Sequence, residues 1–450
     1  MRRLFAAVLI AAAAPAIADD WPEWRGSNRD AIWREAGMPK EAPSGDVQPT
    51  WSTPANLGYA GPAVADGKVY LFEYERSEGS ITDNPGARDN LEGVERLRCL
   101  DSATGRELWR YEYERPYFIS YPSGPRCTPT VDGDRVYALG AEGDLTCLDT
   151  AEGTVVWKKN FKEAYAAPTP QWGHSAHPLV DGDFLYCLVG GEGSVVVAFD
   201  KRTGEEKWKA LSTPSINNEC GYCPPTMIEQ DGERVLAAFH PEGVTALTRD
   251  EGKVLWSVPI DSSYGMSIAQ PVQVKDLLFV TGYTGDGGAS VLLKLPTGGG
   301  EPEVVWSGGP KRSISAANST PVPAAEADVI YGVDANDSVL AAVDMASGER
   351  LWQTREPTLA ADAGRRARHG TCFLVRQANT DRFWIASESG DLILASLTPD
   401  KYQELSRFKI VEPTGDAFGR PVWWSHPAFA EGAVFARNDK EIVRVDLATE

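Results

Sequence analysis

A tryptophan recurs along this chain at a nearly constant interval, and this repeat constrains the fold more than any other feature. Successive positions differ by 48, 51, 48, 50 and 46 residues. They are Trp109, Trp157, Trp208, Trp256, Trp306 and Trp352. Each interval holds four short apolar segments separated by Asp-Gly and similar turns. A period of about 40 to 50 residues with four strands in each unit predicts a β-propeller, in which every unit is one blade.

The unit at residues 127–161 shows the pattern most clearly. Asp132-Gly133 provides the positive φ angles of a tight hairpin turn between the first two strands. The second strand is expected at 135–139, the third at 145–148 and the outer strand at 155–157. We expect the indole of Trp157, in the outer strand, to pack between neighbouring blades.

The two ends of the chain complete one another in this pattern. The eighth unit begins at His426 and stops near Glu450 before an outer strand, whereas residues 47–51 have the outer-strand pattern, ending in Trp51, without earlier strands. We therefore predict an all-β, eight-bladed propeller of four-stranded antiparallel blades, closed by an N-terminal strand in the last blade. The alternative is seven blades with a disordered tail.

Two units depart from the pattern. An acidic, glycine-containing insertion interrupts the first unit between about Glu75 and Glu95. In the seventh unit, Leu405 stands where we expect the tryptophan.

The composition agrees with one large propeller domain at residues 47–450, preceded by a lead-in segment at 19–46. Apolar residues make up 42% of the chain, and no Pro/Ser-rich linker divides the units. The net charge is −20, from 64 acidic and 44 basic residues. Nucleic acids and anionic membrane surfaces both favour basic patches, so neither is an expected partner.

The first 18 residues have the pattern of a signal peptide. Arg2 and Arg3 precede an apolar run from Leu4 to Ala14, and a small-residue cleavage site follows before Asp19. We expect a periplasmic or secreted protein, by either the general or the twin-arginine route. No cysteine follows the cleavage site for a lipid anchor, and no later apolar stretch approaches the length of a membrane span.

Seven cysteines leave at least one unpaired in an exported protein. Cys99, Cys147 and Cys187 lie within expected strands, where we expect buried thiols. Cys220 and Cys223 have the spacing of a redox or metal pair, and a local disulfide is our preferred interpretation. Two free thiols and a metal site remain as alternatives.

The repeat motifs resemble one known family. Asp132-Gly133-Asp134-Arg135-Val136-Tyr137, and the run Asp200-Lys201-Arg202-Thr203-Gly204 that leads to Trp208, are similar to the pyrroloquinoline quinone-like β-propeller repeat family. The resemblance covers about residues 47–450. The opening Trp21-Pro22-Glu23-Trp24-Arg25-Gly26 also resembles the lead-in of exported bacterial members. Such a repeat indicates the fold strongly and the function weakly.

Two branches of that family imply different functions. The quinoprotein alcohol and sugar dehydrogenases hold the quinone on calcium under an adjacent cysteine pair, and this chain has no Cys-Cys dipeptide. The other branch consists of periplasmic scaffold propellers, similar to the lipoprotein component of the outer-membrane β-barrel assembly machinery. We therefore predict a non-catalytic binding or scaffold protein without a cofactor. The alternative is a dehydrogenase that depends on pyrroloquinoline quinone and calcium and acts on alcohols or sugars.

Chemically active side chains gather just before the first strands of the units, where the loops of a propeller surround the mouth of its central channel. The candidate binding residues are Arg126, His174, His177, Asn217, Glu219, Tyr222, Gln270, Asn318, Arg368, His369, Trp424 and His426. We expect them to bind a protein or a polar small molecule to a monomer. The alternative is that these loops only satisfy one another's hydrogen bonds. No metal site is predicted, because opposite blades are too far apart to share one ion.

Overall fold

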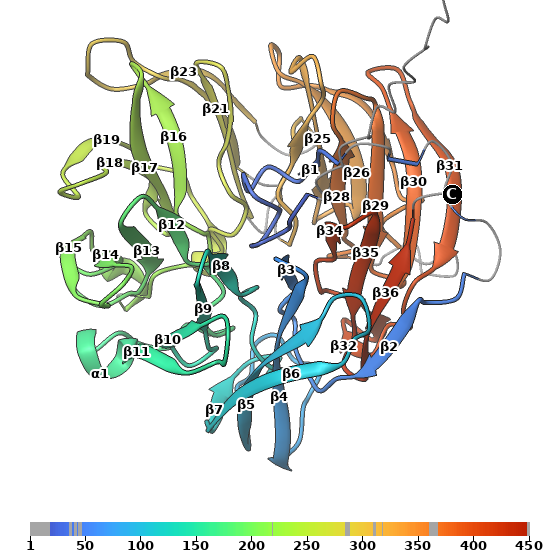
Figure 1. Cartoon of the computed structure of the whole chain (residues 1–450). Helices are drawn as coiled ribbons and strands as arrows, with labels where there is room; N and C mark the ends of the chain where they lie inside the picture. The colour runs from blue at the N-terminus through green and yellow to red at the C-terminus, as the bar shows by residue number, and fades with distance from the viewer. Residues whose placement is uncertain are drawn as a thin grey trace, which may run out of the picture.

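The computed structural model describes residues 19–35, 38–39, 43, 47–217, 219–283, 289–308, 312–316, 318–359 and 368–447. The proposed signal peptide at 1–18 therefore lies outside the described residues. Eight blades, each built on four antiparallel strands, stand around a common axis (Figure 1). This confirms the predicted eight-bladed β-propeller.

The first seven blades each contain four strands that follow one another in the chain, from the axis outward. Blades one to four are β3 (Ala63–Ala65), β4 (Lys68–Gly79), β5 (Asp89–Asp101), β6 (Glu107–Glu114); β8 (Thr130–Asp132), β9 (Arg135–Leu139), β10 (Asp144–Asp149), β11 (Val155–Asn160); β12 (Leu179–Asp181), β13 (Phe184–Leu188), β14 (Val196–Asp200), β15 (Glu206–Ala210); and β16 (Thr226–Gln230), β17 (Glu233–His240), β18 (Gly243–Thr248), β19 (Val254–Val258). Blades five to seven are β20 (Val272–Val274), β21 (Leu277–Gly282), β22 (Ala289–Lys294), β23 (Glu303–Gly308); β24 (Val322–Pro323), β25 (Val329–Asp334), β26 (Val339–Asp344), β27 (Arg350–Thr354); and β28 (Cys372–Gln377), β29 (Arg382–Ser387), β30 (Asp391–Leu397), β31 (Tyr402–Lys409).

The eighth blade joins the two ends of the chain. Its inner strands are β34 (Ala428–Ala430), β35 (Ala433–Arg437) and β36 (Glu441–Asp446), and its outer strand is β2 (Trp51–Pro54). β2 pairs antiparallel with β36, with Trp51 opposite Arg444 and Thr53 opposite Ile442. In Figure 1 the blue β2 lies beside the red β36. The predicted closure by the N-terminal strand is therefore confirmed.

An inter-blade tryptophan contact, which we define by its hydrogen bond, joins six of the eight pairs of neighbouring blades, whereas the indole N–H of Trp256 donates to the side chain of Gln230 in its own blade. The indole N–H of Trp157 donates to the carbonyl of Lys201 in the next blade, at 3.1 Å. Its ring lies against Gly204, where an added Cβ would come within 2.7 Å of the indole. The same bond to the next blade joins Trp109 to Thr150, Trp208 to Arg249, Trp306 to Met345, Trp352 to Thr398 and, across the closure, Trp51 to Ser102. The expected position of the indoles between blades is confirmed.

The register of blade seven corrects the assignment of Leu405. In blade six Trp352 pairs with Ala342 immediately before a β-bulge, and in blade seven Ser406 pairs with Leu394 at the same point. Ser406 therefore occupies the tryptophan position. Leu405 is 43% exposed, like the aliphatic residue that precedes the tryptophan in several other blades. The sequence pattern missed this because a serine gives no apolar signal.

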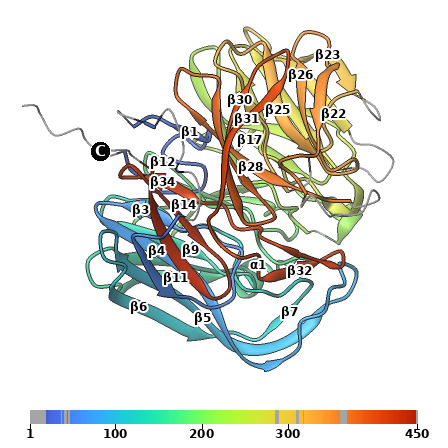
Figure 2. The ribbon, with the colours of Figure 1, turned by 90° about the vertical axis from the view of Figure 1, so that its right-hand side faces the viewer.

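The insertion in the first unit is mostly regular structure rather than an interruption. Residues 75–79 continue β4 and residues 89–95 belong to β5, so the insertion lengthens one hairpin. The strand β7 (Tyr117–Ile119) pairs with the extended part of β5. Figure 2 shows this long hairpin on the same side of the ring as the hairpin of β32 (Gly415–Ala417) and β33 (Arg420–Val422).

The lead-in residues 19–35, which we call the channel segment, lie inside the ring (Figure 1). Trp21 exchanges two backbone hydrogen bonds with Val64 of blade one, and the carbonyl of Pro22 accepts from Val131 of blade two. The strand β1 (Ile32–Trp33) pairs in parallel with β28 of blade seven. The channel segment therefore contacts the innermost strands from several sides and fills the channel.

Helical structure is limited to α1 (Phe161–Tyr165) and the 3₁₀ turns η1 (Pro214–Ile216) and η2 (Ser263–Gly265) in the described part of the chain. None of these helices has the length and apolarity that a membrane span requires.

The ring closure predicts a specific loss of stability. Replacing Trp51 by Ala removes both the hydrogen bond to Ser102 and the packing against Phe435. We expect a fall of roughly 2 to 4 kcal/mol in the free energy of unfolding, measured by denaturant titration. The control is Val254→Ala on the outer strand of blade four, whose side chain is 56% exposed. Equal stability of the two variants would show that the ring does not depend on this contact.

Candidate functional site

A cavity of about 910 Å³ opens at the end of the channel where the chain enters the first strands. Loops from around the whole ring line it. Nine of the twelve candidate residues line this mouth cavity: Arg126, His177, Asn217, Glu219, Tyr222, Asn318, His369, Trp424 and His426. The structure therefore brings together residues that lie up to 300 positions apart in sequence.

Three candidate residues do not line the mouth cavity. His174 is buried, with its ring against Phe161. Gln270 accepts no hydrogen bond on its side-chain oxygen among the described residues, and its backbone N–H donates to Thr320. Arg368 is exposed. These positions follow the same loop pattern in sequence, but they are not part of the cavity lining that the other nine share.

The floor of the mouth cavity is a stack of rings built on the channel segment. The indole of Trp24 lies parallel to the imidazole of His177, with 4.6 Å between ring centroids, and meets the edge of His426 at 5.7 Å. His426 in turn lies 3.7 Å from the ring of Phe373. The Nδ1 atom of His177 accepts a hydrogen bond from the backbone N–H of Thr128, at 3.0 Å. Trp24 therefore positions both floor histidines.

Burial keeps these imidazoles uncharged near neutral pH. Burial and the nearby charge of Arg25 lower the pKa of His426 to about 3. Burial also holds the pKa of His177 well below its usual range, and Arg29 lowers it further. The pKa of His369 is lowered by burial and by Arg420 and Arg368. An anionic ligand would therefore find no imidazolium among these three residues.

Aromatic rings form much of the wall. Trp424 lies near Tyr59, Tyr121 and Phe418, with centroid distances of 6.1 to 6.3 Å. Phe418 stacks on His369 at 4.6 Å. The other aromatic residues of the cavity lining are Trp172, Tyr222, Tyr264, Tyr283 and Phe373.

Most of these aromatic residues were not among the candidates from sequence. Trp24 stood out only as part of the lead-in motif, and Phe418 lies in the β32–β33 hairpin, which the repeat pattern does not contain. In the sequence these residues share one property: each is an aromatic residue in an irregular segment. This property alone does not predict whether the ring faces the cavity.

A carboxylate joins the two hairpins beside the cavity. Asp83, at the tip of the β4–β5 hairpin, accepts hydrogen bonds from the backbone N–H groups of Phe418 and Gly419, at 2.9 and 2.6 Å, and from the hydroxyl of Tyr121 at 2.9 Å. Burial alone would raise the pKa of Asp83, but these hydrogen bonds hold it below its usual value. The insertion of blade one thus fixes the aromatic wall near blades seven and eight.

The guanidinium of Arg126 connects loop segments through hydrogen bonds to their backbone carbonyls. It is half-buried, and it donates to the carbonyls of Trp172 at 2.8 Å and Ser120 at 3.0 Å, as well as to those of Gly124 and Tyr121. It also lies over the ring of Tyr59. All three of its nitrogens therefore already have acceptors, and Arg126 has little capacity left for a ligand.

Glu219 contributes a carboxylate to the cavity lining. Its side chain lies 3.9 Å from the guanidinium of Arg88. Burial raises the pKa of Glu219, and the charge of Arg88 opposes that shift. The amides of Asn217, Asn318 and Gln171 also line the cavity. The lining thus offers many ring faces and a few polar groups, which is the usual composition of a small-molecule pocket.

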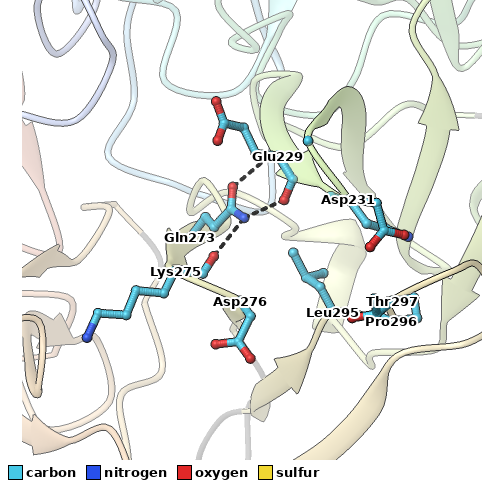
Figure 3. Close-up of a pocket in the computed structure, with 10 residues that line it drawn as sticks. Glu229, Asp231, Gln273, Lys275, Asp276, Leu295, Pro296 and Thr297 are labelled. Atoms are coloured by element: carbon cyan, nitrogen blue, oxygen red, sulfur yellow. Dashed lines mark hydrogen bonds between the residues drawn. The ribbon is translucent and has the colours of Figure 1, made fainter.

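A second pocket, of about 520 Å³, lies between blades four and five at the opposite ends of their strands (Figure 3). The side chain of Gln273 spans the gap there: it accepts from the N–H of Glu229 at 2.8 Å and donates to the carbonyls of Glu229 and Lys275. These hydrogen bonds hold blades four and five together, so this pocket is not our candidate site.

The disulfide predicted between Cys220 and Cys223 is absent, and all seven cysteines are free and buried. Cys220 packs with Leu236 between blades three and four, whereas Cys223 packs with Phe239 between blades four and five. The two thiols face different packing layers, so their sequence spacing does not bring them together. Cys99, Cys147 and Cys187 are buried as expected.

The described residues do not fit the quinone and calcium of the alternative function. No group of three or more His, Cys, Asp or Glu side chains among them is arranged to hold a metal ion. Pyrroloquinoline quinone carries three carboxylates, and the arginine of the cavity lining, Arg126, is already committed to carbonyls. The described lining therefore lacks the positive charge that such a cofactor requires.

Comparison with known proteins gives one family and one fold. The family described as outer membrane protein assembly factor BamB matches residues 94–354 and 303–450. None of the curated proteins compared with the chain matches it.

Solved structures give the fold. BamB from Moraxella catarrhalis aligns with 15% identity and a TM-score of 0.39, over 89% of this chain and 99% of its own. The quinohemoprotein alcohol dehydrogenase from Comamonas testosteroni aligns with 13% identity and a TM-score of 0.58, over 96% of this chain and 81% of its own. The quinohemoprotein alcohol dehydrogenase ADHIIG from Pseudomonas putida HK5 aligns with 12% identity and a TM-score of 0.54, over the same shares. At these identities the two dehydrogenases show a shared propeller fold alone.

The neutral floor histidines predict a pH dependence of stability. The pKa of His426 is about 3 in the folded chain, against an ordinary value of 6.5. A lowered histidine pKa contributes stability above pH 6.5, and this stability is lost as the pH falls toward 3. Replacing His426 by Gln, which does not titrate, should therefore reduce the loss of unfolding free energy between pH 7 and pH 5 by about 2 kcal/mol. Urea titrations at both pH values measure this difference, and identical pH profiles for the two proteins would contradict it.

Proposed function

Since the chain belongs to the family described as outer membrane protein assembly factor BamB, we propose that it is an exported, non-catalytic propeller that binds a ligand in its mouth cavity. The observation that carries the proposal is the cavity itself, about 910 Å³ with walls of aromatic rings from around the ring of blades. Stacked rings and a few amides favour binding, because they provide contact area and orientation at little conformational cost.

The titratable groups of the lining support binding rather than redox chemistry. Burial keeps His177 and His426 uncharged, and Arg126 is held by carbonyls. The described residues also do not assemble a metal site. A quinone-dependent dehydrogenase would need groups that hold the cofactor's carboxylates and a metal, so we place this function second.

The ligand in this proposal is a protein segment or a polar small molecule, and the place of action is the cell envelope. The sequence pattern of residues 1–18 supports export. The net charge of −20 disfavours nucleic acid and anionic membrane surfaces as partners. We propose that the chain acts as a monomer. Its own strand β2 closes the ring, so the fold does not need a strand from a second copy.

Exposed aromatic residues at the rim allow a test that spares the fold. Tyr264 is 78% exposed and Phe418 is 40% exposed, and both line the mouth cavity. We expect the double variant Tyr264→Ser, Phe418→Ser to lose at least about tenfold in ligand recovery, because it removes two aromatic rings of the lining and aromatic residues are enriched among those that dominate binding. The measurement is mass spectrometry of what the purified protein retains from an envelope extract, both intact and after denaturation.

The matched control removes exposed apolar side chains far from the mouth. Leu108 and Val254 lie on outer strands and are 41% and 56% exposed. The variant Leu108→Ser, Val254→Ser should retain the ligand at the wild-type level. If the rim variant retains it as well as this control does, the ligand does not bind in the mouth cavity.

The same purified protein tests the second function. We expect no dye reduction with alcohols or sugars after addition of pyrroloquinoline quinone and calcium, because the described lining offers neither a free arginine nor a metal site. Steady turnover under these conditions would overturn the non-catalytic proposal.

A further inference from the structure

Arg25 is a buried guanidinium in the channel segment with almost no hydrogen-bond acceptor. Its side chain is 5% exposed. Its Nη2 atom donates to the carbonyl of Pro321 at 3.4 Å. Its Nε and Nη1 atoms have no acceptor among the residues that the structure describes. Burying a charged group without partners costs several kcal/mol, so this arrangement needs a compensating partner.

The neighbouring Arg29 shows how this same segment satisfies a buried guanidinium. Arg29 is also 5% exposed. It forms an ion pair with Glu23 and donates to the carbonyls of His177 and Pro178. Arg437 is likewise buried and Arg126 is half-buried, and both donate to backbone carbonyls. Sparse pairing is therefore not general among the arginines of this fold, although Arg376, which is 8% exposed, also has no acceptor for its Nε among the described residues.

The groups around Arg25 do not neutralise it. The carboxylate whose charge acts on Arg25 is Asp30, which accepts instead from the guanidinium of Arg34 and the N–H of Ile32. The ring of Trp24 lies 5.4 Å from the guanidinium and provides only a cation–π contact. The indole N–H of Trp24 is itself buried without an acceptor.

The surroundings therefore combine one positive charge with several unused donors. A ligand that suits them brings negative charge and accepts hydrogen bonds. A single guanidinium balances a single negative charge, whereas a divalent anion would leave a buried charge uncompensated. The aromatic floor at Trp24 and His426 favours an ion that is easily dehydrated.

We propose that Arg25 holds a small monovalent inorganic anion of the halide class inside the channel, beneath the floor of the mouth cavity. The ion accepts from the free guanidinium nitrogens and completes the electrostatic balance of the channel segment. This site is separate from the mouth cavity and does not depend on the proposed ligand of that cavity.

Thermal unfolding at constant ionic strength tests the site in solution. Sodium bromide replaces sodium gluconate stepwise, because gluconate is too large to enter the channel. Wild-type protein should show a saturable rise of roughly 2 °C or more in Tm, because a ligand that binds only the folded state stabilises it. Arg25→Gln should show no saturable rise. Arg202→Gln is the matched control, since Arg202 is an exposed arginine in the turn between β14 and β15, and it should behave as wild type.

Anomalous diffraction gives a direct result even if Arg25→Gln fails to fold. Crystals of the wild-type protein soaked in bromide should show an anomalous peak within about 3.5 Å of Nε or Nη1 of Arg25, the distance of a hydrogen-bonded ion. Solvent density without anomalous signal at Arg25 would mean that water satisfies the guanidinium, and it would overturn the proposal. An equal bromide response of wild type and Arg25→Gln would overturn it as well.

Discussion

The contact between a tryptophan and the next blade is the interaction on which the rest of this structure depends. A four-stranded blade cannot bury its apolar faces alone, so each blade is stable only against its neighbours. The indole N–H of Trp157 reaches the carbonyl of Lys201 in the next blade, and its ring covers Gly204. Gly204 has a φ of 72°, so the turn that carries the carbonyl needs glycine both for its backbone angle and for the space that the ring occupies. Trp51 makes the same contact with Ser102 and Gly105 and closes the ring.

A closed ring leaves a channel along its axis, and the channel segment determines what that channel becomes. Arg29 binds backbone carbonyls at the start of blade three, and β1 extends the sheet of blade seven. These contacts hold Trp24 under His177 and His426. The channel is therefore a cavity with a floor at its mouth. The same packing places Arg25 in the interior without a carboxylate partner. Asp30 does not fill this role because its carboxylate accepts from Arg34 and from the N–H of Ile32.

Much of the fold and part of the candidate site could be predicted from the sequence. The period predicted the blades and the closure by Trp51, because strand alternation and turn chemistry are local properties. Loops before the first strands must converge at the mouth in any propeller, and nine candidate residues do line the cavity there. His174 and Arg368 follow the same pattern but do not line the cavity, because the direction of a loop side chain depends on packing partners from other blades. Cys220 and Cys223 are close in sequence but lie in different packing layers for the same reason.

The sequence by itself determined the eightfold repeat, the family and the region in which to look for a site. Spacing, turn residues and apolar alternation are written along the chain, and they suffice for these conclusions. Only the tertiary structure decided that Trp24 forms a floor, that Phe418 and Trp424 form a wall beside Asp83, and that Arg25 is buried with so few acceptors. These features arise from contacts between segments hundreds of residues apart. Such contacts depend on how far each loop reaches across the ring, and no local pattern encodes that distance.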